Sequence, residues 1–268
     1  MNAVESGRDE MKILKWMAGA FATYSRVPMP KLDQDRDDVQ KSLMFFPLVG
    51  LFTGGAVYMI NCLPRLSGLP AAVRIILTIL LPILITGGFH IDGLMDTMDA
   101  MNSYASREKK LEILKDPHIG AFAVIGLVKW ILIDAAGVTA ILLSDKADRA
   151  VIAAFCLTFV LSRVSSALTS LLFKKARTDG MLCEETGGKQ TGVIICLTLT
   201  GVLTVFLMLI LNTSLAVAVL AALTLFMIRY RKKTFSEFGG VTGDTAGYFV
   251  TAFEALTALV MGAALNLI

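Results

Sequence analysis

Three aspartates recur at helical spacing within residues 90–99, which read His-Ile-Asp-Gly-Leu-Met-Asp-Thr-Met-Asp. Asp92, Asp96 and Asp99 are four and three residues apart, so a helix turning about 100° per residue places them on one narrow face. At a rise of about 1.5 Å per residue, the outer two are about 10.5 Å apart along the axis. One Mg²⁺, with oxygen ligands at about 2.1 Å, does not easily bridge that span. The row therefore predicts either two ions or one ion and a proton acceptor.

The alternative for this row is a solvated acidic face at the end of a helix. Carboxylates on one stripe repel each other unless cations lie between them. The setting favours a site, because the stripe begins directly after Gly87 and Gly88 at a predicted membrane boundary, with apolar residues behind it. His90 would lie roughly opposite Asp92 on a continuous helix. It joins the site only if the glycine pair distorts the start of the helix, and a structural role for His90 is left open.

A second polar motif, residues 115–120, lies in the same predicted loop and contains Lys115, Asp116 and His118. Pro117 ends the predicted helix over 107–115, and Gly120 directs the chain into the next span. These residues can line a site, or they can form only a turn with a helix cap.

A basic segment over residues 174–180 includes Lys174, Lys175 and Arg177. Cations at this density suit phosphate, through charge-assisted and bidentate contacts. Anchoring at the membrane surface is the better explanation for the two lysines. Arg163 lies deeper, inside an apolar run, and an arginine there should face a partner or a wet cavity. The other charges at that depth are Asp134, Lys129 and Glu254.

A glycine-rich segment over residues 238–245 opens the last apolar run. Its glycines let backbone N–H groups approach an anion, and the helix that follows points its positive end at the same place. Asp244 can instead cap that helix. The candidates for substrate binding here are Gly239, Gly240, Thr242, Gly243 and Asp244.

The elements that must position these motifs are membrane-spanning helices. The chain has 268 residues, 55% of them hydrophobic, with a mean hydropathy of +0.69, above the roughly 45–50% apolar content of soluble domains. We predict an all-α polytopic membrane protein, a single domain over 1–268, with a helix at the membrane interface over 11–24. Apolar runs near 20 residues predict about seven spans: 42–62, 72–90, 119–143, 149–172, 191–211, 214–229 and 245–267.

Positive charge is distributed unevenly between the two sets of connections. Of the 25 Lys and Arg residues, 19 fall in segments 1–41, 91–118, 173–190 and 229–244, and only three fall in the alternate connections. The positive-inside rule places the richer set in the cytoplasm. All the motifs above belong to that set, so we expect an active site facing the cytoplasm. The four cysteines form no C-x-x-C pair, which excludes a Cys-based zinc site or redox dithiol by spacing.

Together these residues resemble the cobalamin synthase family, the adenosylcobinamide-GDP ribazoletransferases. The family pattern H-x-D-G-x-x-D-T-x-D is matched by residues 90–99, K-D-x-x-I-G by 115–120, and G-G-x-T-G-D-T by 239–245. An R-x-P-x-P segment at 26–30 and F-P-L-V-G at 46–50 also agree. The resemblance covers nearly the whole chain, in order.

The resemblance implies the last assembly step of cobalamin biosynthesis. The ribose 3′-hydroxyl of α-ribazole, or of its 5′-phosphate, attacks the cobinamide-side phosphorus of adenosylcobinamide-GDP, and GMP leaves. It implies Mg²⁺ on Asp92, Asp96 and Asp99 to clamp the diphosphate, and His90 or a free aspartate to accept the hydroxyl proton. The residues that would contact the substrate are Arg26, Lys115, Asp116, His118, Arg163 and Arg177, with those of the glycine-rich segment.

The expected setting is the bacterial inner membrane, with a lipid bilayer and small-molecule substrates as partners, no nucleic acid, and a homo-oligomer left open. One alternative is another membrane phosphotransferase, either a CDP-alcohol phosphotransferase or a prenyltransferase. The D-G-x-x-A-R opening of the former is absent, and the latter generally shows two acidic clusters. A transporter using Asp134, Arg163 and Glu254 is a different class, but no internal repeat supports it.

Overall fold

The computed structural model describes residues 3–267, with side chains described from residue 11. Within this range the chain is helical, and its one β-bridge is isolated. The helices are α1 (Ala3–Tyr24), α2 (Arg36–Ser42), α3 (Phe46–Cys62), α4 (Pro64–Ser67), α5 (Ala71–Thr86), α6 (Phe89–Asn102), α7 (Arg107–Ile113), α8 (Ala121–Leu142), α9 (Arg149–Leu172), α10 (Met181–Glu185), α11 (Thr191–Leu211), α12 (Thr213–Phe238) and α13 (Gly243–Leu267). A 3₁₀ turn, Leu43–Phe45, joins α2 to α3.

The predicted polytopic architecture is confirmed. Among the described residues, six helical segments are long and apolar enough to cross a membrane, and the bent pair α5 and α6 can make a seventh. Two predicted boundaries were wrong. The span predicted over 72–90 ends at Thr86, and the basic residues 229–233, predicted to lie in a loop, continue α12 to Phe238.

The break between α5 and α6 has a local cause. Gly87 and Gly88 have φ values of 63° and 82°, in the left-handed region that side chains with a Cβ rarely adopt. The two helices meet at 93°. Because α6 turns away from the direction of α5, we treat α6 as lying across one end of the bundle, outside the membrane-spanning segments.

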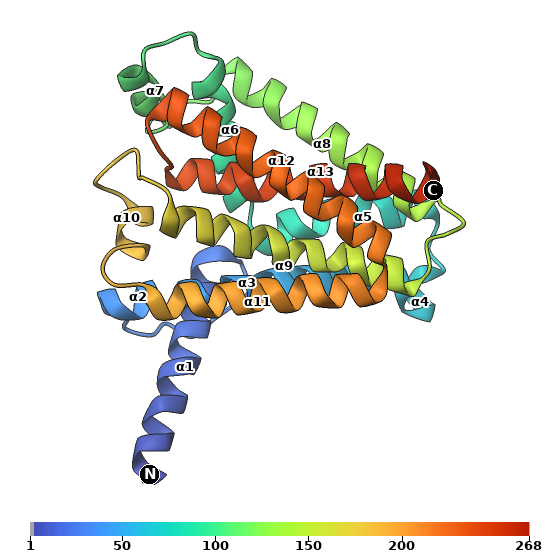
Figure 1. Cartoon of the computed structure of the whole chain (residues 1–268), viewed down its shortest axis with the longest axis horizontal. Coiled ribbons are helices and arrows are strands. Elements are labelled where there is room, and N and C mark those ends of the chain that lie inside the picture. Colours follow the sequence, from blue (N-terminus) through green and yellow to red (C-terminus); the bar gives the residue numbers. More distant parts are fainter. Residues whose placement is uncertain (1–2, 268) are drawn as a thin grey trace.

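The long helices lie side by side, and the polar connections collect at the two ends of the bundle (Figure 1). α7, α10 and α2 lie at one end, and α4 and the C-terminus lie at the other. The basic segments therefore lie at one end of the bundle, as the charge pattern predicts. α1 projects from that region across the direction of the bundle helices (Figure 1), which agrees with a helix lying along a membrane surface.

α9 forms the centre of the bundle. In its most apolar 18-residue window, 83% of the residues are buried, against 22% for α8 and for α11. The two peripheral helices therefore turn most of their apolar side chains outward, where lipid would contact them. The principal core contains Phe155 and Phe159 of α9 with Phe249 and Phe253 of α13.

Candidate functional site

The aspartate stripe forms as predicted on α6. Asp92 is exposed and Asp96 and Asp99 are half-buried, whereas Leu94 and Met98 on the other side are buried. The helix thus packs its apolar face against the bundle and leaves its carboxylates at the edge. It starts directly after the glycine break, so the stripe begins where the chain leaves α5.

Two glycines bring the stripe against the start of α13. A Cβ built on Gly93 would lie 2.7 Å from the carbonyl oxygen of Asp244, and one on Gly247 would lie 3.1 Å from the carbonyl oxygen of His90. Since real Cβ atoms do not approach backbone closer than about 3.0 Å, a side chain at Gly93 would separate the helices. The acidic stripe and the glycine-rich segment therefore meet, as the shared basic loops predict.

The glycine-rich turn is fixed to the basic segment that follows α9. Val241 donates its N–H to the carbonyl of Lys174, and Ala176 donates its N–H to the carbonyl of Val241, both at 2.9 Å. A Cβ on Gly240 would lie 2.3 Å from that Lys174 carbonyl, so the pairing requires glycine. This short bridge carries Arg177 to the mouth of the turn.

Thr242, and not Asp244, caps α13. The N–H of Thr245 donates to Oγ1 of Thr242 at 3.2 Å, and the N–H of Thr242 donates to Oγ1 of Thr245 at 2.9 Å. This reciprocal pair occupies two backbone donors at the helix start. The carboxylate of Asp244 is thereby left out of the cap, although it accepts a hydrogen bond from Oγ1 of Thr242 at 3.3 Å.

A cleft of about 180 Å³ lies at this end of the bundle. It is lined by α6, by the basic segment with α10, and by the glycine-rich turn with the start of α13. Asp92 and Asp244 line it from α6 and α13, and Arg177 lines it from the basic segment. Arg177 donates from Nη2 to the carbonyl of Leu111 at 2.6 Å, while its buried Nε–H has no partner in the described structure. A wider pocket next to the cleft shares Asp92 and contains Arg26, which packs against Gly87.

Of the stripe, only Asp92 lines this cleft, and Asp96 and Asp99 continue along α6 beside it, where the carboxylates crowd one another. Burial, which is the largest cause, and the negative charges of Asp92, Asp244 and Asp99 together raise the pKa of Asp96 to about 7. The Asp99 carboxylate sits against Gly120, where a Cβ would overlap it. A cation among these groups would relieve the repulsion.

The donor set has the chemistry that Mg²⁺ requires, since all its members are carboxylate oxygens. Among the described residues, however, no three Asp, Glu, His or Cys side chains converge closely enough to enclose one ion. This agrees with the axial spread expected for Asp92 and Asp99. Mg²⁺ usually takes only one or two carboxylates and completes its shell with water and substrate phosphate oxygens. The stripe fits that open form of site and does not form a closed cage.

Lys115, Asp116 and His118 lie at the same end of the bundle but outside the cleft. Asp116 accepts the backbone N–H of His118 at 3.0 Å, and this contact, together with the His118 ring, lowers the pKa of Asp116. Lys115 is 3.0 Å from Asp179, an ion pair that is more than half exposed on both sides. The turn alternative accounts for Asp116 and His118 in this structure, while Lys115 reaches a residue that lines the cleft.

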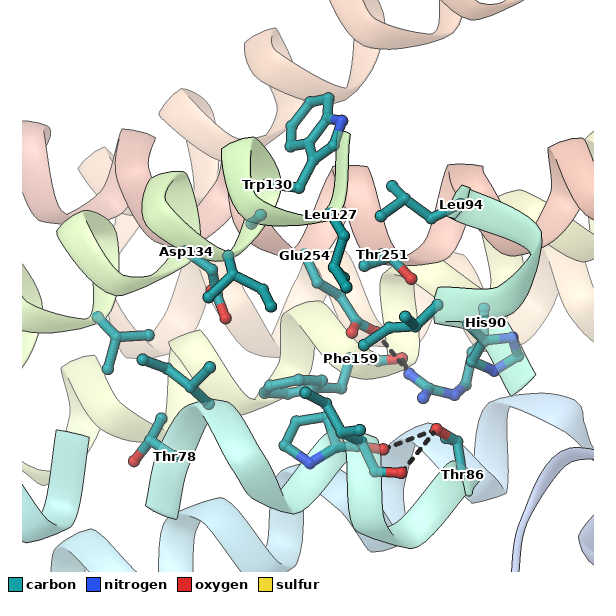
Figure 2. Close-up of a pocket in the computed structure, with 18 of the residues that line it drawn as sticks. Thr78, Thr86, His90, Leu94, Leu127, Trp130, Asp134, Phe159, Thr251 and Glu254 are labelled. Carbon is teal, nitrogen blue, oxygen red and sulfur yellow. Dashed lines mark hydrogen bonds and ion pairs between the residues drawn. The ribbon is translucent and has the colours of Figure 1, made fainter. Parts of the chain in front are cut away.

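His90 and Arg163 are not brought to the cleft. His90 is 5% exposed and lies among the rings of Tyr24, Phe46 and Phe89, facing the bundle interior. Arg163 is fully buried and donates from Nη1 to Oε1 of Glu254 at 2.6 Å, so the expectation of a buried partner is confirmed. Both residues line a separate interior cavity (Figure 2).

Several cleft residues were not among the sequence candidates. Phe89, Asp179, Met181 and Leu182 line the cleft with the predicted residues. Asp179 stands next to the cations of the basic segment, and a search for acids as well as bases there would have found it. Met181 and Leu182 belong to the short helix α10, and nothing in their type or spacing signals a site.

Comparison with known proteins shows the family to which the chain belongs. Residues 17–262 match the family model described as cobalamin-5-phosphate synthase. A protein of Lachnoclostridium phytofermentans named adenosylcobinamide-GDP ribazoletransferase is 36% identical over 92% of this chain and 94% of its own length. Proteins of the same name from Shewanella baltica and Clostridium botulinum are 31% and 28% identical, over 85% and 90% of this chain and 86% and 94% of theirs. No solved structure matches the chain.

The fold and the one-ended acidic cleft define a multi-pass membrane protein with a polar site at the end of its helical bundle. The chain belongs to the cobalamin-5-phosphate synthase family and is an enzyme of cobalamin biosynthesis, a transferase.

Proposed function

We propose that the chain transfers adenosylcobinamide phosphate from adenosylcobinamide-GDP to the 3′-hydroxyl of α-ribazole or of α-ribazole 5′-phosphate, with Mg²⁺ as cofactor. The oxygen–phosphorus bond to the acceptor forms as the bond to the bridging oxygen breaks, GMP leaves, and the hydroxyl proton passes to a base. The relatives carry the name of this activity. The observation that carries the proposal is that Asp92 of the acidic stripe and the capped start of α13 line one cleft.

The residues of the cleft suit phosphoryl transfer, which depends on positioning and charge neutralisation more than on covalent help. Mg²⁺ held by Asp92, Asp96 and Asp99 would neutralise the diphosphate and stabilise the charge on the leaving oxygen. Arg177 lines the cleft and Arg26 lines the wider pocket that shares Asp92, so both guanidinium groups can bind phosphate oxygens. The start of α13 adds backbone N–H groups near Gly243.

Proton removal from the acceptor falls to a carboxylate of the cleft in this proposal. His90 faces away from Asp92, so it does not reach a hydroxyl bound there without a rearrangement of α6. A carboxylate of the stripe that is not engaged with Mg²⁺ can take the proton.

The charge pattern supports an orientation of the chain in its membrane. We place the chain in the bacterial inner membrane with the cleft in the cytoplasm, because the cleft lies at the end of the bundle that carries most of the basic residues. Labelling of single introduced cysteines in inverted and right-side-out vesicles tests this orientation.

The decisive assay is GMP release by the purified protein in detergent or nanodiscs with Mg²⁺, adenosylcobinamide-GDP and α-ribazole. We expect release that needs both substrates and stops with excess EDTA. Unchanged turnover in EDTA would remove the metal from the proposal. CMP release from a CDP-activated lipid, with none from adenosylcobinamide-GDP, would instead select the CDP-alcohol phosphotransferase activity.

A further inference from the structure

An interior cavity lies behind the first turn of α6, on the side opposite the aspartate stripe. It is lined by α5, α8, α9 and α13 as well as by α6. Figure 2 shows the carboxyl groups of Asp134 and Glu254 directed into this space, with His90 at its α6 end. Most of the remaining wall is apolar, with Leu94, Leu127 and Phe159 among its side chains, and Arg163 and the threonines Thr78, Thr86 and Thr251 also line it.

Several buried side-chain nitrogens of the residues that line this cavity have no hydrogen-bond partner in the described structure. Nη1 of Arg163 makes all three of that side chain's hydrogen bonds, to Glu254, to the Phe159 carbonyl and to Ser162. Its Nε and Nη2 are buried with no partner in the described structure, and so is Nε2 of His90. Buried donors nearly always have a partner, so a water or ligand that accepts hydrogen bonds is expected beside Arg163.

The charge of the cavity excludes phosphate as that ligand. Glu254 neutralises Arg163 at 2.6 Å, and Asp134 adds a further carboxyl with no added cation. A phosphate would therefore bring negative charge to a buried space that has no net positive charge. A purely aliphatic occupant such as a lipid tail would leave the Arg163 donors unpaired. The chemistry left is an uncharged, largely apolar group that presents a hydrogen-bond acceptor.

The size of the cavity fits a small ring system. The space open to the centre of a water molecule is about 60 Å³. At about 10–15 Å³ of such space per water, it has room for roughly four to six waters. These occupy about 120–180 Å³ as liquid, since each takes about 30 Å³. That is the size of a bicyclic heteroaromatic ring with small alkyl groups.

The cavity adjoins the reaction site through the helix break. Thr86 and Ile91 line both the cavity and the surface pocket that contains Arg26 and Asp92. A ligand with its apolar end inside the cavity would thus emerge beside the carboxylate stripe, at the point where α5 gives way to α6.

We propose that this cavity binds the alkylated benzimidazole base of the acceptor nucleoside, with Arg163 donating a hydrogen bond to the unsubstituted ring nitrogen. This inference rests on the proposed function, which supplies α-ribazole as the acceptor. The base offers one acceptor and an apolar body, which matches the unpaired donors and the apolar walls. The sugar then extends past the break to the pocket that contains Arg26 and Asp92. An apolar binding site inside the bundle also gives a reason for joining soluble reactants within a membrane protein.

The test fills the cavity without touching its charges. Leu127→Trp on α8 should raise the KM for α-ribazole at least tenfold, with the KM for adenosylcobinamide-GDP changed less than twofold. Val128→Trp is the matched control, because Val128 is the next residue on α8, is 51% exposed and does not line the cavity. An equal effect of the two variants on the acceptor KM, or none from Leu127→Trp, would overturn the proposal.

A second measurement uses the unaltered protein and therefore carries no risk of misfolding. The matched probe is the 5,6-dimethylindole riboside with the same sugar linkage, in which C–H replaces the unsubstituted ring nitrogen. We expect it to bind at least tenfold more weakly than α-ribazole, because a hydrogen bond to a charged donor is lost. Equal affinity of the two nucleosides would mean that water or lipid satisfies Arg163 and would overturn the assignment.

Direct binding of α-ribazole, measured by calorimetry without donor substrate, separates the two levels of inference. Nucleoside binding that Leu127→Trp weakens, with no GMP release in the full assay, would retain the cavity assignment and reject the proposed reaction. If the protein releases GMP but Leu127→Trp leaves the acceptor KM unchanged, the proposed reaction would be retained and the cavity assignment rejected.

Discussion

The end of the bundle and its interior handle charge in opposite ways. Beside the cleft, Asp92, Asp96 and Asp99 form no ion pair with any side chain of residues 11–267, and their mutual repulsion helps to raise the pKa of Asp96 to about 7. In the interior, Arg163 is held 2.6 Å from Glu254, and Ser162 also donates to that carboxylate at 2.7 Å. Unpaired carboxylates near water favour a function that brings its own cations. A paired charge in an apolar space serves stability or the orientation of a neutral ligand.

The sharpest way to break this comparison is to remove carboxylates from the stripe beside the cleft. We expect Asp96→Ala and Asp99→Ala each to reduce GMP release at least about a thousandfold, since a metal at a transferring phosphoryl group contributes several kcal/mol. Because the stripe lies at the edge of the bundle, both variants should still purify as folded protein, which size-exclusion chromatography and circular dichroism would show.

Asp145→Ala is the control for those two variants, because Asp145 is an exposed carboxylate in the connection after α8, away from the cleft. It should retain full activity. Near-normal turnover in Asp96→Ala and Asp99→Ala would mean that the stripe is only a solvated face.

A substitution in the interior should lower the stability of the fold, whereas substitutions in the stripe lower activity. Glu254→Gln leaves the buried guanidinium of Arg163 without its countercharge, and breaking a buried pair in this way costs about 3–5 kcal/mol. We expect a marked fall in the thermal unfolding midpoint of the detergent-solubilised protein. An unchanged midpoint would show that water already compensates the charge of Arg163, so that the pair does not stabilise the fold.

The close crossing of α6 and α13 links the two regions, and a single methyl group should disturb it. Gly93→Ala places a Cβ 2.7 Å from the Asp244 carbonyl, so the helices must separate and the carboxylates of Asp92 and Asp244 move apart. We expect a fall of about tenfold to a hundredfold in kcat/KM, the scale of misplacing reacting groups by about 1 Å.

Gly55→Ala on α3 provides the matched change, since a Cβ there meets nothing within 4 Å. It should leave activity unchanged. Equal activities of the two alanine variants would contradict a site that depends on the crossing.

Much of the site could be predicted from sequence because it depends on local periodicity. The spacing of Asp92, Asp96 and Asp99 defines a helix face wherever the helix lies, and the basic loops indicate that the stripe and the glycine-rich turn share one end. His90 could not be placed in this way. Its direction depends on the 93° turn at Gly87 and Gly88, which apolar hydropathy across 72–90 conceals.

The sequence also could not show which of several suitable side chains forms a given contact. Asp244 and Thr242 are both good capping residues, and only the hydrogen bonds show that Thr242 caps α13. The contact between Arg163 and Glu254 joins residues 91 positions apart, and Asp134 was an equal candidate by depth. Pairings of this kind are decided by helix packing, which the pattern of a single helix does not contain.

The exposed ion pair between Lys115 and Asp179 should produce the smallest effect on stability. Both side chains are more than half exposed, and such pairs contribute only about 0–1 kcal/mol. We therefore expect Asp179→Asn to leave the unfolding midpoint nearly unchanged, in contrast to Glu254→Gln.

If Lys115 instead serves the donor diphosphate, Lys115→Ala should raise the KM for adenosylcobinamide-GDP severalfold. The effect should shrink at high salt because screening weakens exposed charges. Lys146→Ala, an exposed lysine in the connection after α8, should change neither quantity. A KM that Lys115→Ala leaves unchanged would restrict Lys115 to its surface pair and leave phosphate binding to Arg177 and Arg26.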